Sequence, residues 1–354
     1  MKELVLNNTP VRTSVNFGIN NISVKEIELP QNLEKFKNFN LINETENIDV
    51  SYNATLDEEK FVYGVGDEVE NLEKNSKFRI KLKESAKNEK VFLKYNLNKK
   101  ESALSNYIKI DAKEKSNGSV VIKYNSEDNN THLAMESIKI DVQKDSIVQV
   151  VIINMLNEIS TNLLSVEVKL EENANVNVII IDFGGKTSIS NYYSNLEGKN
   201  SNSELDTIYL GDKERLIDLN YISHLRGEKS NTNIEVQGAL KDKAVKNFKG
   251  TIDFKQGCSG SKGNENEFCM LLSDTAKSKA LPMLLCTEDD VEGNHSTASG
   301  KVDKKELFYL MSRGISQKEA MKLIVRAKFT PIIEKIGVEE VKKRIIDKID
   351  EKLN

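Results

Sequence analysis

A mainly β fold with a helical C-terminal end is what this 354-residue sequence predicts. Between about residues 61 and 286 the chain consists of short apolar runs of strand length, each followed by Asn, Asp, Gly, Lys or Ser. Such runs, with turn residues and almost no helical period between them, indicate β-strands without helical crossovers. After residue 300, capping spacings and an apolar stripe of helical period indicate helices. The strand spacing alone is compatible with a sandwich, a barrel or a parallel β-solenoid.

The first segment, residues 1–65, joins a short apolar start to a polar stretch. Residues 43–59 are rich in Asn and Glu and offer little surface to bury, so we expect a loop or linker there. The opening Met1-Lys2-Glu3-Leu4 has no apolar signal-peptide core, and nowhere do 18 uncharged apolar residues run together. We therefore expect a cytoplasmic protein that does not span a membrane.

The second segment, residues 66–300, should contain the β core. Its clearest strands are the apolar runs at 78–82, 91–95, 120–124, 138–142, 147–153, 176–181 and 234–240. Val and Ile are frequent in these runs, as is usual for strands that pack on a core. The sequence has no strict internal repeat, so it permits a solenoid without requiring one.

The third segment, residues 301–354, should be helical. Asp303 with Glu306, and Ser316 with Glu319, have the spacing of a capping box, so a helix should begin at each. Gly314 should end the first of these helices. The last helix carries one apolar stripe, formed by Val338, Val341, Ile345, Ile346, Ile349 and Leu353. We expect this stripe to pack on the β core, with a partner-docking face as the alternative.

Several dispersed motifs stand in an order that carries more information than any one of them. They are NFGINNISVKEIELP (16–30), YLGDKERLIDLNYISHLRG (209–227), NIEVQGALKDKAVKNFKGTIDF (233–254), LLSDTAKSKALPMLLC (271–286), EGNH (292–295) and FYLMSRG (308–314). Together they resemble the SufB/SufD family of iron-sulfur cluster assembly proteins, closely over the last 150 residues or so and loosely over the first 30. The resemblance implies a right-handed parallel β-helix core, with a small N-terminal segment and a C-terminal helical domain.

The resemblance also implies a non-enzymatic scaffold, most like SufD. D-type members carry a histidine at the position of His295, at the interface with the B-type subunit, where nascent cluster binding is implicated. B-type members carry a cysteine and a glutamate where this chain has Glu267 and Ser296. His295 is therefore our candidate metal ligand in a shared interface site. We expect no stably bound cofactor on this chain, only a transient iron-sulfur cluster at that interface.

The cysteines and the histidine of the 209–227 motif lack metal-ligand spacing. Three cysteines, an odd number, argue against a disulfide framework. Cys258 lies in a Gly/Ser-rich turn, so we expect it to be accessible and retain it as a weak metal-ligand candidate. Cys269 and Cys286 lie in apolar runs and should behave as small buried hydrophobic residues. His224 fits a strand and should be structural.

Two partners follow from the resemblance. In the family, the C-terminal helical domain engages SufC, the ABC-type ATPase, so Phe308, Tyr309, Arg313 and Gly314 are the expected partner-binding residues. The sequence has no Walker A pattern, so ATP hydrolysis should belong to that partner. The second partner is a SufB-like paralogue, or a second copy of this chain, because the ends of a solenoid expose unpaired edges that need covering. A net charge of -4 lacks the basic excess that nucleic-acid binding requires.

Two alternative functions remain open at this point. A homodimeric SufB-like scaffold that assembles clusters with the ATPase alone would need Cys258 or Cys269 as a thiolate. A polysaccharide-acting β-solenoid would offer paired carboxylates and stacking aromatic side chains. This chain has no Trp and only 6% aromatic residues, which argues against the second alternative.

Overall fold

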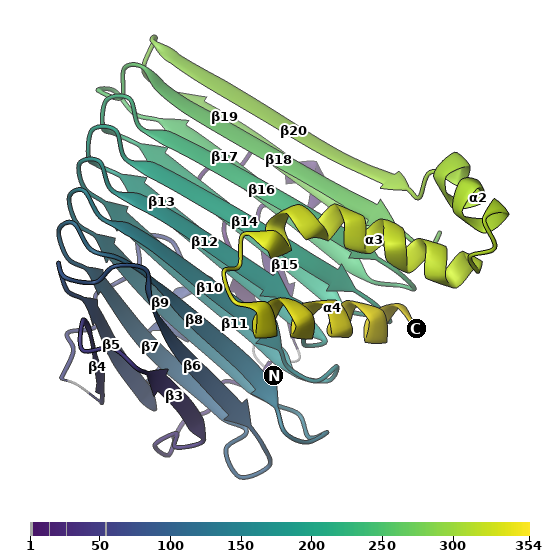
Figure 1. The fold of residues 1–354 in the computed structure, drawn as a ribbon, viewed down its shortest axis with the longest axis horizontal. Coiled ribbons are helices and arrows are strands. Elements are labelled where there is room, and N and C mark those ends of the chain that lie inside the picture. The colour runs from purple at the N-terminus through teal and green to yellow at the C-terminus, as the bar shows by residue number, and fades with distance from the viewer. Residues whose placement is uncertain (1–2, 14, 26, 54) are drawn as a thin grey trace.

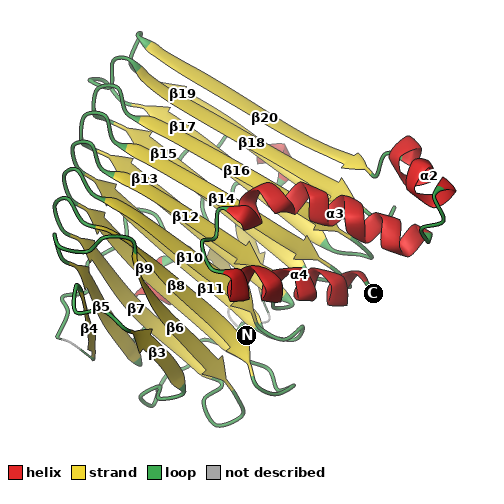
Figure 2. Ribbon diagram, viewed as in Figure 1, coloured by secondary structure: helices red, strands yellow, loops and turns green. Residues whose placement is uncertain are grey.

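Two mostly parallel sheets, wound into a solenoid, form the body of the molecule (Figures 1 and 2). The computed structural model describes residues 3–13, 15–25, 27–53 and 55–354. Successive strands of the core alternate between the two sheets, and the solenoid has about 8 turns. Strands make up 49% of the chain and helices about 14%, so the mainly β fold and the parallel β-helix expected from the family resemblance are confirmed.

Each sheet contains nine strands. The first sheet, in spatial order, contains β20 (Val291–Lys301), β18 (Ser261–Leu271), β16 (Asn231–Leu240), β14 (Asn202–Gly211), β12 (Asn175–Asp182), β10 (Ile147–Met155), β8 (Asn117–Ser126), β6 (Glu89–Leu97) and β3 (Phe39–Asn43). The second contains β19 (Lys277–Cys286), β17 (Val245–Phe254), β15 (Leu216–Leu225), β13 (Thr187–Leu196), β11 (Thr161–Leu170), β9 (Leu133–Val142), β7 (Ala103–Ala112), β5 (Ser76–Leu82) and β4 (Ile48–Tyr52). Every strand run predicted from the sequence lies within one of these strands.

The coils share a turn geometry and vary in length. Thr161 pairs with Thr187, and Val245 pairs with Lys277, so one coil takes from 26 to 32 residues. One corner of successive coils holds a left-handed residue with φ between 55° and 60°, and these residues are Lys115, Asp145, Asn173, Asn200 and Lys229. Asn and Asp tolerate this conformation better than most residues. The repeat is therefore a turn conformation, which explains why no strict repeat is visible in the sequence.

The interior of the solenoid is filled by the inward-facing side chains of both sheets. These form one continuous apolar cluster from the first coil to the last. Val150 and Ile152 of β10 face this interior, whereas Val151 and Ile153 face outward and are also buried. Both faces of the strand are therefore covered, which is why it reads as an unbroken Val/Ile run and lacks alternation.

The N-terminal segment covers the outer face of the second sheet. β1 (Leu4–Leu6) and β2 (Ile22–Val24) pair with each other and pack on Leu163 and neighbouring apolar residues. A short 3-10 helix (Val15–Phe17) lies between these strands in sequence. The four-residue helix α1 (Asp67–Glu70) adds to the same layer.

Residues 43–59 are only in part the loop or linker that their composition predicts, because residues 48–52 form a strand. β4 lies in this stretch, β3 ends at its first residue, and the two pair antiparallel with β5 and β6 at the N-terminal end of the solenoid. Ile48 is buried, and the Tyr52 ring lies 4.6 Å from the ring of Phe39. The prediction was wrong for residues 48–52 because two or three apolar side chains suffice to fix a five-residue edge strand in a polar stretch.

Three helices complete the chain. Figure 1 shows α3 (Gln317–Glu334) and α4 (Glu339–Leu353) lying across the first sheet, with α2 (Lys304–Ser312) projecting beyond the end of β20. The Asp303 carboxylate accepts a hydrogen bond from the Lys305 backbone N–H at 2.7 Å, and the Ser316 hydroxyl accepts one from the Glu319 N–H at 3.3 Å. Both predicted helix starts are confirmed. Gly314, with φ of 86°, follows the end of α2 as predicted.

The apolar stripe of α4 packs on the β core, as the sequence predicts. Ile345, Ile349 and Leu353 are buried in a cluster with the outward-facing side chains of the first sheet. Two lysines also join the helical layer to the sheet. Lys335 contacts Asp206 of β14 at 2.7 Å, and Lys352 contacts Asp212, which directly follows β14, at 2.8 Å. None of the helices in the described ranges is both long and apolar enough to span a bilayer.

Candidate functional site

The last coil leaves one edge of each sheet without a neighbouring strand. Among the residues that the structure describes, β19 pairs only with β17, and β20 pairs only with β18. These edges run for 10 and 11 residues, and most residues of β20 are exposed. A long free edge presents a row of unpaired N–H and C=O groups that a further strand can occupy.

His295 lies in the middle of the free β20 edge. It is the register partner of Glu265 on β18. Register partners in a parallel pair project to the same face, about 4.8 Å apart. Glu265 is buried against Gly250 in the interior of the solenoid. The His295 side chain therefore occupies an interior-facing position, and it is exposed because β20 ends the sheet.

The solenoid interior beside His295 contains five side chains with polar groups. We name them the terminal-coil cluster: Tyr209, Lys246, Glu265, Glu267 and Cys269. The Lys246 ammonium donates to the Glu267 carboxylate at 2.7 Å, and the Tyr209 hydroxyl donates to the same oxygen at 3.1 Å. All five side chains are buried. This cluster places hydrogen bonds and a buried ion pair in the interior of the terminal coils.

Glu265 is the unpaired member of the terminal-coil cluster. Neither of its carboxyl oxygens has a hydrogen-bond partner among the described residues. Burial, with a smaller contribution from the neighbouring Glu267 charge, raises the pKa of Glu265 to about 8. Desolvation disfavours the charged form of a carboxyl group, so Glu265 is largely protonated at neutral pH. Burial likewise raises the pKa of the Cys269 thiol.

The cysteines are placed differently from two of the three predictions. Cys258 is fully buried and its thiol pKa is raised by burial, so the expected accessibility was wrong: the Gly/Ser-rich turn folds its thiol into the solenoid interior. Cys286 is exposed, because it ends an edge strand whose apolar run has no further coil to cover it. Cys269 is buried as predicted.

The structure does not bring the candidate ligands together. Cys258 and Cys286 lie at the turns around the start of the last coil, whereas His295 lies four residues into β20. Within the described ranges, no three His, Cys, Asp or Glu side chains are close enough to hold a metal ion. His224 is buried on β15 beside Tyr193, and burial lowers its pKa to about 4, which agrees with the predicted structural role.

The expected partner-binding residues lie on the projecting helix α2 or directly after its end. Phe308 is 73% exposed and Tyr309 is 57% exposed. The Arg313 guanidinium stacks over the Tyr309 ring, 5.5 Å from its centroid, and Gly314 follows directly. Leu307 and Leu310 pack inward on the helical layer. The helix thus turns its aromatic side chains away from its own fold.

The family model for the SUF system FeS cluster assembly SufBD core domain matches residues 95–328. The chain belongs to the SufBD family. Among its relatives are the iron-sulfur cluster assembly protein SufD of Bacillus subtilis, 30% identical over 166 residues, and a SufBD family protein of Pyrococcus horikoshii, 31% identical over 175 residues. A SufBD family protein of Mycobacterium leprae is 26% identical over 183 residues.

These matches cover 47 to 49% of this SufBD family chain and 38 to 47% of the relatives. The chain therefore spans less than half the length of the curated relatives that it matches. The matched family domain contains nearly all of the coils, from the end of β6 to β20, together with α2 and most of α3. The residues that match the family model are thus largely those that form the solenoid.

Sequence reasoning missed most of the terminal-coil cluster. It considered Glu267 and Cys269 separately and did not name Tyr209, Lys246 or Glu265. The signal was present in the alternation Glu265-Asn266-Glu267-Phe268-Cys269, because a strand places every second side chain on one face. What the sequence does not indicate is that this face is the solenoid interior.

Proposed function

We propose that this chain is a SufD-like scaffold subunit of a SUF iron-sulfur cluster assembly complex. In this proposal it pairs with a SufB-like paralogue, docks a SufC-like ABC ATPase and has no catalytic activity of its own. The iron-sulfur cluster is the cargo of the complex. The observation that carries the proposal is the free edge of the last coil, which has His295 at its centre.

The free edge favours pairing with a second solenoid. The N-terminal end of the molecule is closed by two antiparallel strands of five residues each, β3 and β4. Short edge strands are one of the ways in which proteins prevent edge-to-edge association. The 10- and 11-residue edges at the other end have no such protection. A partner with a similar last coil would satisfy them with backbone hydrogen bonds.

A paralogue is favoured over a second copy as the partner. One histidine from this chain cannot hold a cluster, since iron-sulfur clusters need several ligands dominated by thiolates. The homodimeric alternative would need Cys258 or Cys269 as thiolates, yet both are buried and burial raises the pKa of each. The missing thiolate is best supplied by a Cys-bearing partner across the edge.

The projecting helix α2 supports docking of the ATPase. Exposed aromatic side chains on a helix that does not bury them are typical of the anchors of protein interfaces. Phe308 and Tyr309 meet this description, and the Arg313 stack holds the second ring in place. A cytosolic location stays a prediction.

The test is an affinity purification of the full chain, expressed with a tag in its native host under anaerobic conditions. Mass spectrometry identifies the co-purifying proteins, and iron is measured on the complex. We expect an ABC ATPase and a Cys-bearing SufBD paralogue. Recovery of the ATPase alone, with iron, would favour the homodimer, and recovery of neither partner would refute the proposal.

Three variants separate the two surfaces. Phe308→Ala with Tyr309→Ala should lose the ATPase and keep the paralogue, whereas His295→Ala should keep both proteins and lower the iron content. Val62→Ala is the matched control, because Val62 is 62% exposed and lies on the N-terminal segment. Retention of the ATPase by the double variant would contradict the role of α2. Unchanged iron in His295→Ala would contradict the role of the histidine.

A further inference from the structure

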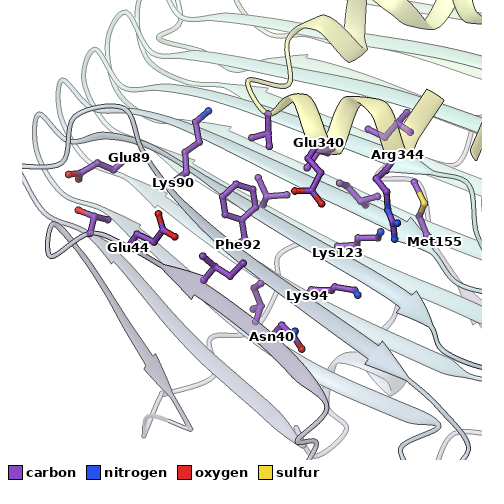
Figure 3. Close-up of a pocket in the computed structure, with 18 residues that line it drawn as sticks. Asn40, Glu44, Glu89, Lys90, Phe92, Lys94, Lys123, Met155, Glu340 and Arg344 are labelled. Carbon is purple, nitrogen blue, oxygen red and sulfur yellow. The ribbon is translucent and has the colours of Figure 1, made fainter. Parts of the chain in front are cut away.

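A cavity of about 810 Å³ lies between α4 and the outer face of the first sheet (Figure 3). Strands β3, β6, β8 and β10 form its floor. α3 contacts β14 and β16, and α4 lies beside α3 on the side toward β8 (Figure 1). The cavity therefore opens at the margin of the helical layer, where the sheet continues past α4. Its volume is in the range typical of small-molecule sites.

The middle of this cavity is apolar. Phe92 of β6 stands at its centre in Figure 3, and Val341 of α4 and Ile42 of β3 contribute to its walls. Ile42 is 53% exposed, although it lies on a strand that otherwise pairs normally with β6. The cavity thus presents apolar surface to solvent that a ligand with an apolar body would cover.

One end of the cavity is cationic. Lys94 of β6 and Lys123 of β8 are register partners, so the two ammonium groups project from adjacent strands to the same face. Arg344 of α4 approaches them from the opposite wall (Figure 3). Like charges directly opposite each other in a sheet are destabilising. Burial, followed by the positive charges of Arg344 and Lys94, lowers the pKa of Lys123 to about 8.

These three cations lack protein acceptors. Among the described interactions, no hydrogen bond or ion pair joins Lys94, Lys123 or Arg344 to another residue. Glu340 offsets the charge near Lys123 only in part. Other lysines of α4 are paired: Lys342 contacts two glutamates, and the lysines at 348 and 352 contact acidic side chains at 2.7 and 2.8 Å. In the cavity, by contrast, three cations without such a partner line one end together.

The opposite end of the cavity has two carboxylates and one ammonium group, from Glu44, Glu89 and Lys90 (Figure 3). Glu89 accepts a hydrogen bond from Asn47 at 2.7 Å, and the Lys90 ammonium donates to the Gly337 carbonyl, so this end carries a net negative charge. The ends of the cavity therefore differ in sign, and an anionic group is favoured at one end only. This polarity would orient an asymmetric ligand.

We propose that this cavity binds a small amphipathic anion, with its carboxylate or phosphate group between Lys94, Lys123 and Arg344. The apolar body of the ligand lies against Phe92 and Ile42. Charge-assisted hydrogen bonds from three cations compensate their mutual repulsion, and the apolar wall supplies the remaining affinity. The inference does not depend on the proposed scaffold function, because the cavity is remote from β20 and from α2.

Calorimetric titration of the full chain tests the proposal with four probes: decanoate, decyl phosphate, 1-decanol and inorganic phosphate. We expect one molecule of either anionic amphiphile to bind at least about tenfold more tightly than the alcohol or the inorganic ion. Equal affinity for decanoate and decanol would overturn the proposal, since no anion site is then used. Binding to vesicles of anionic lipid without binding of monomeric decanoate would overturn the small-molecule ligand.

Two variants locate the site. Lys123→Met should weaken decanoate binding at least about tenfold and should not impair folding, because it removes a like-charge repulsion. Lys144→Met, at an exposed lysine paired with Glu172 on a distant turn, should leave the affinity unchanged. Equal affinities of the wild type and the Lys123 variant, or several bound molecules that this variant does not affect, would refute the site.

The pH dependence provides an independent readout. Lys123 is faced by Lys94 of β6 and by Glu340, Arg344 and Lys348 of α4. Since its pKa is about 8 without ligand, an anion must bind together with a proton at higher pH. Decanoate, which is ionised throughout, should bind about tenfold more weakly at pH 9 than at pH 7. The Lys123→Met variant should lack this dependence, and an unchanged wild-type affinity at pH 9 would contradict the role of the ammonium group.

Discussion

Glu265 should make the stability of the protein fall as the pH rises from 5 to 8. Its pKa is raised from 4.5 to about 8 in the folded state. Because the pKa in the folded state lies above the pKa in the unfolded state, the carboxyl group does not reduce the free energy of unfolding well below pH 4.5. It destabilises the fold increasingly as the pH rises toward 8. A shift of this size corresponds to about 5 kcal/mol at high pH, of which about half accrues between pH 5 and pH 7.

The substitution Glu265→Gln removes the ionisation and keeps the shape of the side chain. The buried amide has a desolvation cost of its own, but that cost is the same at both pH values. We therefore expect the difference in thermal midpoint between variant and wild type to be about 3 °C larger at pH 7 than at pH 5, for a chain of this length. Differential scanning calorimetry at the two pH values measures this directly.

The control is Glu228→Gln at an exposed glutamate that pairs with Lys199 at 2.8 Å. Exposed ion pairs contribute little, so this variant should shift the midpoint by less than about 1 °C at either pH. If Glu265→Gln gave the same shift at pH 5 and pH 7, the carboxyl group would not be titrating in this range. The account of the terminal-coil cluster as a desolvated site would then be wrong.

Two further predictions concern the interior and the thiols. Arg215→Met should lower the free energy of unfolding by about 3 to 5 kcal/mol in urea denaturation, because the buried guanidinium donates to Asp182 Oδ1 at 2.5 Å and to three backbone carbonyls. Arg226→Met, at an exposed arginine, is the control and should cost less than about 1 kcal/mol; a similar loss in both variants would contradict the argument. A maleimide should label one thiol of the native protein, Cys286, and all three thiols in urea; labelling of two native thiols would refute the burial of the others.

The parts of the fold that the sequence predicts are those that local chemistry determines. The helix starts at Asp303 and Ser316 depend on a hydrogen bond two or three residues away. The stripe of α4 follows from a period within one helix. The Val/Ile strands need only cover on both faces. In each case the information lies within about ten residues, and the structure agrees.

The parts that sequence reasoning missed depend on contacts between distant segments. β15 contains the buried Asp218, which no apolar pattern would place in a core. The Asn7 amide donates to this carboxylate at 2.6 Å, and the Lys249 ammonium donates to it at 2.5 Å. Asn7 lies 211 residues away in the sequence. The partners of this carboxylate come from the N-terminal segment and from β17, and no local pattern within β15 contains that information.

The same reasoning explains why the candidate site was predicted only in part. His295 and α2 could be located from motifs, because motif residues keep their order in the chain. The terminal-coil cluster could not be located, because it exists only where β14, β17 and β18 turn their inner faces toward one another. Cys258 was misplaced for the related reason that a turn in a solenoid can direct its side chain inward.

The two ends of the solenoid differ in how they are covered. Its N-terminal end is closed by short antiparallel strands, and its two outer faces are covered by the N-terminal segment and the C-terminal helices. At the other end a long free edge lies over a buried ion pair and the protonated Glu265. A partner that covered this end would exclude water from His295 and strengthen every electrostatic interaction beside it. Under the proposed scaffold function, pairing at this end would therefore change the electrostatic environment of His295.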